Sequence, residues 1–188
     1  YITDYGNGDI YQCPINISTG QMGTCIKPAN NADIPTAAKS DGVAFYTNQS
    51  ESNYVLFAGY SDGNIYTCQI ESNNSMQGCS AAGNSNFNDL GVGPTGITFG
   101  FGKAYIADWS GGGVYICDIS QTANLSNCAL SPNFTGGKPE QLTMQGNVLF
   151  VADGYSNQTV WKCEINPVDG SIASSCTATP DATYPTGT

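Results

Sequence analysis

Histidine is absent from the 188 residues, and this absence removes several classes of site. Without histidine the chain cannot hold a Ser-His-Asp or Cys-His catalytic centre, a His-ligated zinc ion or a histidine pH switch. Basic residues are also scarce, because five Lys and Arg stand against fifteen Asp and Glu, which gives a formal net charge of −10. So acidic a protein is not expected to bind nucleic acid or an anionic membrane through its surface charge.

Long apolar runs are absent as well. No run approaches the roughly 20 residues of a membrane-spanning helix, so we expect no direct membrane insertion. The chain opens on Tyr1-Ile2-Thr3-Asp4 with neither an initiator Met nor a signal-peptide pattern, and we expect a processed or partial product. Charged residues make up only 11% of the chain and hydrophobic residues 40%, which is enough for a buried core. The sequence therefore predicts one folded domain over residues 1–188.

What the sequence does contain is an internal repeat. Around four of the eight cysteines, an aromatic residue, the Cys and an Ile alternate with other residues at period two, in Tyr11–Ile15, Tyr66–Ile70, Tyr115–Ile119 and Trp161–Ile165. This alternation predicts a β-strand with those three side chains on one face. A second strand is predicted upstream of each one, across a glycine-rich turn, at residues 1–4, 56–59, 105–108 and 150–153.

Two further strands complete each repeat. An inner strand is predicted to begin at Pro94-Thr95-Gly96, at Pro139, at Pro35-Thr36-Ala37 and at Pro185-Thr186-Gly187, and a fourth strand surrounds the second cysteine of each pair. Four short antiparallel strands in about 40 to 50 residues have the size of a β-propeller blade. The predicted repeats are 1–34, 35–93, 94–138 and 139–184, with 185–188 starting a further innermost strand. Because Pro35 lies far from Leu56, residues 48–53 are predicted to form an enlarged hairpin tip.

The third repeat carries a family resemblance. Its run from Pro94-Thr95-Gly96-Ile97 through 103–109 to 114–117 resembles the repeat of YVTN-type and NHL-type β-propellers, particularly the cysteine-containing ones. The resemblance covers essentially the whole chain, although Gly59 replaces the Asp in the second repeat. It implies an all-β propeller of four repeats, either complete or part of a longer or polymeric array. Such repeats serve binding, scaffolding and occasional catalysis, so the resemblance implies no single function.

The eight cysteines are predicted to form one disulfide in each repeat. Neighbouring antiparallel strands lie within the Cα separation that a disulfide needs, which favours Cys13/Cys25, Cys68/Cys79, Cys117/Cys128 and Cys163/Cys176. The alternative is metal binding, but the chain has no Cys-x-x-Cys motif and no histidine to complete a site. Disulfides predict an extracellular or cell-surface location, or the periplasm of a bacterium.

Six Asn-x-Ser/Thr motifs are candidate glycosylation sites: Asn16, Asn48, Asn73, Asn124, Asn133 and Asn157. About three would occur by chance in a chain so rich in Asn, Ser and Thr. Asn16, Asn73 and Asn124 each lie between the two cysteines of their repeat, so we expect them on one rim of the molecule. In a eukaryotic protein this placement predicts a glycan coat, whereas in a bacterium the motifs would be accidental.

An aromatic residue follows the second strand of every repeat. These residues, Tyr5, Tyr60, Trp109 and Tyr155, would lie on one face of a propeller beside Asp4, Asp108 and Asp153. A ring of aromatic side chains and carboxylates could bind a sugar. The alternative is structural, with the rings packed between blades and the Asp side chains capping turns. Asp41-Gly42 and Ser61-Asp62-Gly63-Asn64 hint at calcium loops but are better explained as surface turns.

The sequence alone favours a secreted, non-enzymatic structural or protein-interaction module without a cofactor. The alternatives are a sugar-binding lectin that uses the aromatic face, a filament subunit that donates a strand to the next copy, and an enzyme with a carboxylate site. The expected partners are other protein subunits or extracellular glycans, with a homopolymer as one form. The enzyme hypothesis requires two carboxylates that face each other across a central pocket.

Overall fold

The computed structural model describes residues 1–28, 39–83, 93–155 and 158–179, and these contain strands and no helix. They form one two-stranded sheet and three four-stranded sheets, all antiparallel and all in chain order. The strands are β1 (Ile2–Thr3) and β2 (Ile10–Tyr11); β3 (Ser40–Thr47), β4 (Asn53–Gly59), β5 (Asn64–Ile70) and β6 (Met76–Ala81); β7 (Pro94–Gly100), β8 (Lys103–Asp108), β9 (Gly113–Ile119) and β10 (Leu125–Leu130); and β11 (Gln141–Gln145), β12 (Val148–Asp153), β13 (Thr159–Glu164) and β14 (Thr177–Ala178). The predicted all-β fold is confirmed, and so are the predicted second and third strands of each repeat.

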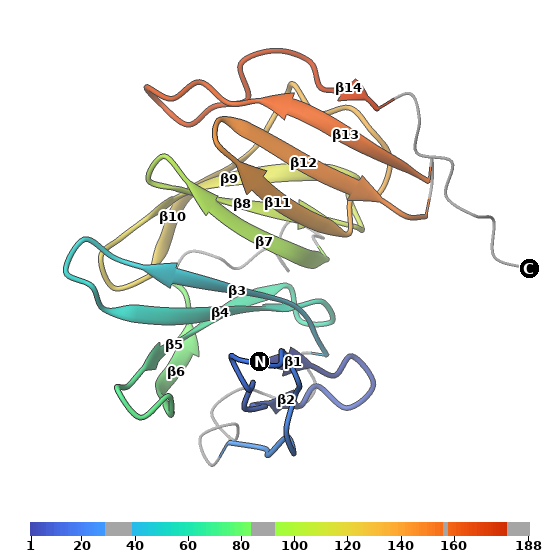
Figure 1. Cartoon of the computed structure of the whole chain (residues 1–188). Helices are drawn as coiled ribbons and strands as arrows, with labels where there is room; N and C mark the ends of the chain where they lie inside the picture. Colours follow the sequence, from blue (N-terminus) through green and yellow to red (C-terminus); the bar gives the residue numbers. More distant parts are fainter. Residues whose placement is uncertain (29–38, 84–92, 156–157, 180–188) are drawn as a thin grey trace, which may run out of the picture.

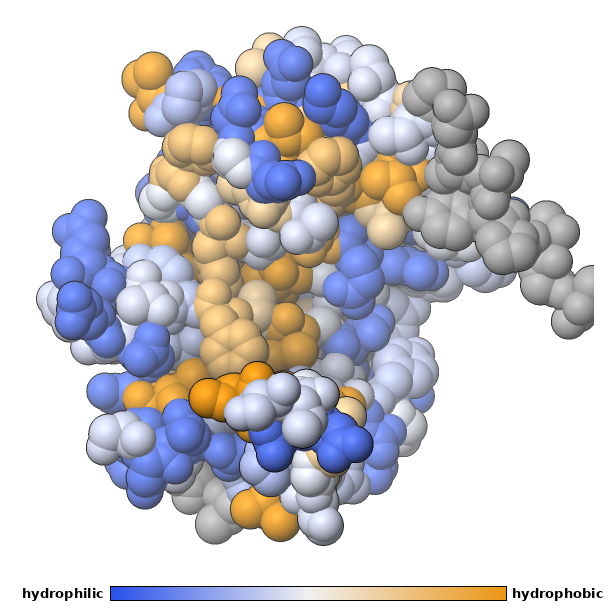
Figure 2. Space-filling view, viewed as in Figure 1, coloured by the Kyte–Doolittle hydropathy of each residue, from blue (hydrophilic) through white to orange (hydrophobic). Residues whose placement is uncertain are grey.

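The four sheets follow one another like the blades of a propeller. The first strands of the three larger sheets, β3, β7 and β11, lie side by side, and the remaining strands of each sheet lie beyond them (Figure 1). A strip of apolar side chains covers the middle of this same face and is flanked by hydrophilic residues (Figure 2). None of the described residues forms a helix that could cross a bilayer.

The inner strand of the second repeat lies directly before the predicted hairpin tip. It runs over Ser40–Thr47, and its predicted start at Pro35-Thr36-Ala37 lies outside the described residues, as does Pro185-Thr186-Gly187. The hairpin between β3 and β4 does turn within the predicted tip, where Asn48 Oδ1 accepts hydrogen bonds from the amides of Ser50 and Ser52 at 2.9 Å. Asp41 lies within β3, and not in the surface turn predicted for Asp41-Gly42.

Three apolar clusters lie between successive sheets. The clusters join the first sheet to the second through Ile10 and Phe57, the second to the third through Leu56 and Ile106, and the third to the fourth through Tyr105 and Val151. Alternate residues of the middle strands face opposite neighbours, which is why consecutive residues such as Leu56 and Phe57 are both fully buried. The core of this fold is therefore divided among interfaces between blades.

Two glycines allow the inner strands to approach one another. A Cβ built on Gly42 of β3 would lie 1.8 Å from the Thr95 carbonyl oxygen of β7. A Cβ on Gly96 of β7 would lie 2.7 Å from the carbonyl oxygen of Glu140, just before β11. Both obstacles are backbone atoms that cannot rotate away, so only glycine permits this spacing.

The variant Gly42→Ala is therefore expected to lose about 3 kcal/mol of unfolding free energy, because the new methyl group forces β3 and β7 apart. Gly146→Ala is a suitable control, since a Cβ there meets nothing within 4 Å and only the positive φ of 60° opposes it. This control should lose about 1 kcal/mol. Urea unfolding measures both changes, and equal losses would contradict the role given to the close approach.

All four predicted disulfides are present. The pairs Cys13–Cys25, Cys68–Cys79, Cys117–Cys128 and Cys163–Cys176 have Cα atoms 4.1, 4.1, 4.0 and 4.4 Å apart. No cysteine is left free, so the metal-binding alternative for these residues is excluded. Four disulfides in a chain of this size indicate that the protein folds in an oxidising, extracellular-type environment.

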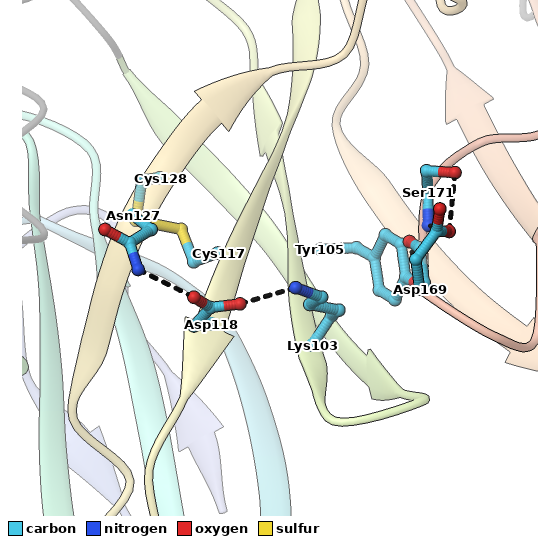
Figure 3. A network of polar contacts seen from close by, with 9 residues as sticks. Lys103, Tyr105, Cys117, Asp118, Asn127, Cys128, Asp169 and Ser171 are labelled. Atoms are coloured by element: carbon cyan, nitrogen blue, oxygen red, sulfur yellow. Dashed lines mark hydrogen bonds and ion pairs between the residues drawn. A yellow bond between two sulfur atoms is a disulfide. The ribbon is translucent and has the colours of Figure 1, made fainter.

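A polar network lies beside the third disulfide (Figure 3). Asp118 of β9 accepts hydrogen bonds from Asn127 Nδ2 at 2.8 Å and from the Lys103 ammonium group. These two hydrogen bonds, first that of Asn127 and then that of Lys103, lower the pKa of Asp118. Tyr105 donates from its hydroxyl to the Gly170 carbonyl at 2.8 Å, which links the third repeat to the fourth. Burial, followed by the charge of Asp169, raises the pKa of Tyr105 to about 12, so this hydroxyl stays a donor.

Candidate functional site

A pocket of about 410 Å³ opens where the inner strands begin. Its walls carry two carboxylates, three aromatic rings, a hydroxyl and an amide, contributed by Tyr5, Asp41, Tyr60, Thr95, Trp109, Glu140 and Gln141. These residues come from all four sheets or from the loops that join them. The pocket thus lies where the repeats converge, which is where a propeller places a ligand site shared by its blades.

Asp41, Thr95 and Glu140 occupy equivalent positions in three successive repeats. Each stands two residues before an apolar residue that pairs with the middle of the second strand, namely Val43 with Phe57, Ile97 with Ile106 and Leu142 with Val151. Glu140 lies directly before β11 and extends its pairing with β12, because the Glu140 amide donates to the Ala152 carbonyl at 2.9 Å. The fold therefore brings one side chain from each of these repeats to the same pocket.

The charge of one acidic side chain acts on the other. Burial, and after it the negative charge of Glu140, raises the pKa of Asp41 above the usual range of a carboxyl group. Gly154 leaves room for the Glu140 carboxylate, because a Cβ at Gly154 would lie 2.7 Å from Glu140 Oε2. A carboxyl group whose pKa is raised beside a second acidic group is an arrangement that acid–base chemistry uses.

The hydroxyl between the carboxylates is fixed by the backbone. Thr95 Oγ1 lies 3.2 Å from the Pro139 carbonyl oxygen and 3.5 Å from that of Ala107, and donates to them. The first of these bonds runs to the residue before Glu140, so Thr95 ties its own repeat to the segment that carries that carboxylate. Among the pocket residues, Thr95 thus acts as a link between two repeats.

The four predicted aromatic residues form one continuous row. The ring centroids of Tyr5 and Tyr60 lie 5.6 Å apart, those of Tyr60 and Trp109 lie 5.7 Å apart, and those of Trp109 and Tyr155 lie 5.5 Å apart. The first three rings line the pocket, and Tyr155 extends the row beyond it. Neighbouring repeats are therefore joined by ring contacts, and the exposed parts of the same rings form a wall on which a sugar can stack.

Two lysines lie over this aromatic row. Lys138 Nζ lies 3.9 Å from the centroid of the Trp109 ring and 5.4 Å from that of Tyr155, and Lys39 Nζ lies 5.3 Å from that of Tyr5. Each ammonium group is attracted to the negative face of its ring. Two positive charges are therefore held beside a pocket whose own walls carry two acidic groups.

The three predicted aspartates lie next to the row but not among the pocket-lining residues. Asp108 is buried, and its Oδ1 accepts hydrogen bonds from the amides of Gly93 and Gly111 at 3.0 and 2.9 Å. Asp4 accepts from the amide of Gly6 at 2.8 Å in a similar turn. Asp153 is buried in the equivalent position of the fourth repeat. For Asp4 and Asp108 these contacts agree with the turn-capping alternative.

The acidic pair and its neighbours Thr95 and Gln141 were missed as site residues from the sequence. When the second inner strand is taken to begin at Pro35, Thr36 is aligned with Thr95 and Glu140, and Asp41 is not. The signal that was available is the residue after the first position of each inner strand, which is Asp in Ser40-Asp41-Gly42, Thr in Pro94-Thr95-Gly96 and Glu in Pro139-Glu140-Gln141. Among the described residues, no group of three or more His, Cys, Asp or Glu is placed to hold a metal ion.

The described sequons differ in exposure. Asn16, Asn73 and Asn124 are exposed, as predicted for one rim, and Asn48 and Asn133 are half-buried. Asn48 Nδ2 donates to the Gln121 carbonyl at 2.6 Å, and Asn133 Nδ2 donates to that of Ile172 at 2.6 Å. Asn157 lies outside the described residues.

Comparison with known proteins identifies the fold. No protein-family model matches the chain, and no curated protein sequence matches it. Among solved structures, the chain is similar to a provisionally named 6-phosphogluconolactonase from Bacteroides fragilis, with a TM-score of 0.60, 16% identity, and coverage of 95% of this chain and 49% of that one. A second protein of that provisional name, from Bacteroides uniformis, has a TM-score of 0.55, 15% identity, and coverage of 89% and 50%.

A third similar structure is an aldose sugar dehydrogenase from Streptomyces coelicolor in its PQQ-bound form, with a TM-score of 0.52, 10% identity, and coverage of 97% of this chain and 61% of that one. The chain spans about half the length of the two Bacteroides proteins. At these identities the similarity shows the fold, and it confirms the predicted β-propeller.

The prediction of a non-enzymatic module is wrong. The β-propellers to which this chain is similar carry the names of enzymes, so the fold gives no reason to exclude catalysis. The structure places Asp41 and Glu140 in the lining of one pocket, where the charge of Glu140 acts on Asp41, so the chain does bring two acidic side chains to one site.

Proposed function

We propose that the chain is a hydrolase that opens neutral sugar lactones in the pocket between Asp41 and Glu140. The observation that carries this proposal is the convergence of two acidic side chains and three aromatic rings on one cavity. The cavity, at about 410 Å³, is large enough for a single sugar ring. Aromatic rings bind the apolar face of a sugar, while carboxylates and the Gln141 amide accept and donate hydrogen bonds to its hydroxyl groups.

The proposed chemistry gives the two acidic side chains different roles. Glu140 takes a proton from a water molecule as the water oxygen attacks the lactone carbonyl carbon, and the ring C–O ester bond breaks. Asp41, which keeps its proton to a higher pH than an ordinary carboxyl group, gives that proton to the departing ring oxygen. The product is the open hydroxy acid, and the negative charge of that acid favours its release from an acidic pocket.

The similar structures support the substrate class. Two are provisionally named as lactonases of a sugar acid, and the third is named as a sugar dehydrogenase. The charge of this pocket, however, favours an unphosphorylated substrate. The chain has no arginine, and the two lysines near the pocket lie against aromatic rings. A phosphate group would therefore meet carboxylates without a bidentate cationic partner.

The proposal is tested by following lactone opening by pH-stat with glucono-δ-lactone, its 6-phosphate and a p-nitrophenyl glucoside. The neutral lactone should open at least about tenfold faster than in buffer, and faster than its phosphate. Cleavage of the glucoside alone would assign the carboxylate pair to glycoside hydrolysis. No acceleration for any of the three substrates would contradict the proposal.

We also infer that the repeats are of the YVTN/NHL type and that the protein works outside the cell, among extracellular glycans or other protein subunits. The repeated Pro-Thr-Gly start and the Tyr-x-Cys-x-Ile strand support the first inference. The four disulfides support the second.

A further inference from the structure

An apolar groove that shares no lining residue with the pocket lies between the first sheet and the second. It has a volume of about 660 Å³, and its lining carries no charged side chain: Tyr1, Gln12, Cys13, Pro14, Ile15, Thr24, Ile26, Phe45, Asn73 and Asn74. Residues 10–26, which form one side of it, contain no charged residue at all. The groove is therefore an uncharged surface on a protein with a net charge of −10.

Large side chains in this groove are exposed. Ile15 is 63% exposed, Ile26 60% and Phe45 56%. The ring of Tyr1 lies 5.7 Å from that of Phe45, so the groove contains an aromatic platform as well as aliphatic side chains. Exposed apolar surface of this kind marks a place where another molecule binds.

A glycosylation motif forms the edge of the groove. Asn73 is exposed in the turn between β5 and β6, and its Oδ1 accepts a hydrogen bond from the Ser75 amide at 2.9 Å. Its Nδ2 has no hydrogen-bond partner among the described residues. The next residue fixes this turn against the first sheet, because the Asn74 carbonyl accepts from Tyr1 Oη and from Gln12 Nε2, both at 2.7 Å. The free amide is thus held beside the aromatic platform.

We propose that Asn73 carries an N-linked glycan whose first sugars cover this groove. In the modification, Asn73 Nδ2 loses one proton and forms a bond to the anomeric carbon of a polyprenyl-diphosphate-linked oligosaccharide. The bond between that carbon and the phosphate oxygen breaks, the polyprenyl diphosphate leaves, and nothing is oxidised or reduced. The apolar face of the first sugar then packs on Tyr1 and Phe45.

Asn16 is an exposed sequon asparagine that lies outside the lining of this groove. Asn16 is exposed in a turn of the same first sheet, where its Oδ1 accepts from the amides of Ser18 and Thr19 at 2.9 and 3.2 Å. It is absent from the lining of the groove. Asn16 is therefore the matched control, because it is also an exposed sequon asparagine but does not line the groove.

The test secretes the full chain from a eukaryotic cell line and compares the wild type with Asn73→Gln, Ser75→Ala and Asn16→Gln. Mass spectrometry should find a glycan on Asn73, and both Asn73→Gln and Ser75→Ala should lack it. Exposure of the groove is read from the fluorescence of the apolar dye ANS, which should rise several-fold in these two variants. Asn16→Gln should leave the fluorescence unchanged.

Two results would overturn the proposal. If mass spectrometry finds Asn73 unmodified in the wild type, the proposed glycan does not exist. If the ANS fluorescence of Asn73→Gln equals that of the wild type, the glycan does not cover the groove. Size-exclusion chromatography decides whether a second copy of the chain is the occupant instead. In that case the glycosylated wild type is a dimer, and the proposal fails.

Discussion

Asp41→Asn is expected to slow the opening of a neutral lactone at least about a hundredfold, because the amide cannot give a proton to the departing ring oxygen. The same variant is expected to be more stable than the wild type at neutral pH. Burial and the charge of Glu140 raise the pKa of Asp41, so the folded state binds this proton more tightly than the unfolded chain does. Ionisation of Asp41 therefore costs folding free energy, and the amide avoids that cost.

The pH dependence has a definite sign. The unfolding free energy contributed by Asp41 is greatest below its unfolded pKa and falls as the pH rises through its raised folded pKa. Asp118→Asn, on the third strand of the third repeat, is the matched control. The pKa of Asp118 is lowered by Asn127 and Lys103, so its contribution is present at neutral pH and is lost as the pH falls.

The two variants should therefore differ in both measurements. Asp41→Asn should lose activity and gain stability at neutral pH, whereas Asp118→Asn should keep its activity and lose a little stability. Steady-state kinetics and urea unfolding at several pH values measure both effects. Full activity of Asp41→Asn would show that the Asp41 carboxyl group takes no part in the reaction.

The loss of the second disulfide is expected to have the largest effect on stability. Cys68 is fully buried and Cys79 is nearly so, and both belong to the cluster between the first and second sheets. The double variant Cys68→Ala/Cys79→Ala should lose about 3 kcal/mol through the entropy of the unfolded chain. The cavity left by two sulfur atoms should raise the total loss to about 4 kcal/mol.

Cys13→Ala/Cys25→Ala provides the comparison. Its loop is closed over a sequence separation of 12, against 11 for the second disulfide, so the entropic loss should be nearly the same. Its sulfur atoms are more exposed, so little is lost in packing. Urea unfolding under non-reducing conditions measures both variants, and a greater loss for the first disulfide would contradict this assignment.

The middle strands of each repeat were predictable because their chemistry is local. An aromatic residue, a cysteine and an isoleucine alternate at period two in all four repeats, and a second cysteine follows the first by 11 to 13 residues, so strand and disulfide follow from the same pattern. The aromatic row was predictable for the same reason, since Tyr5, Tyr60 and Trp109 directly follow equivalent strands.

The acidic pair was not predictable in this way, because it depends on how the repeats meet. The inner strand Ser40–Thr47 lacks the proline that marks the third and fourth repeats, and the proline at position 35 gave a misleading alternative. Its correct place is set by Gly42, which packs against the backbone of Thr95 in another sheet. A contact between strands so far apart along the chain leaves no periodic signal in the sequence.

The pairing of Asp41 with Glu140 is the central claim, and a ¹³C NMR titration of the Asp41 carboxyl carbon tests it most directly. In the wild type this carbon should titrate above the ordinary range of an aspartate, and Glu140→Gln should lower its pKa by removing the neighbouring charge, although burial should keep it raised. A titration in the ordinary range that Glu140→Gln leaves unchanged would contradict the claim. The two carboxyl groups would then not share a site, and the proposed acid–base reaction would have no basis.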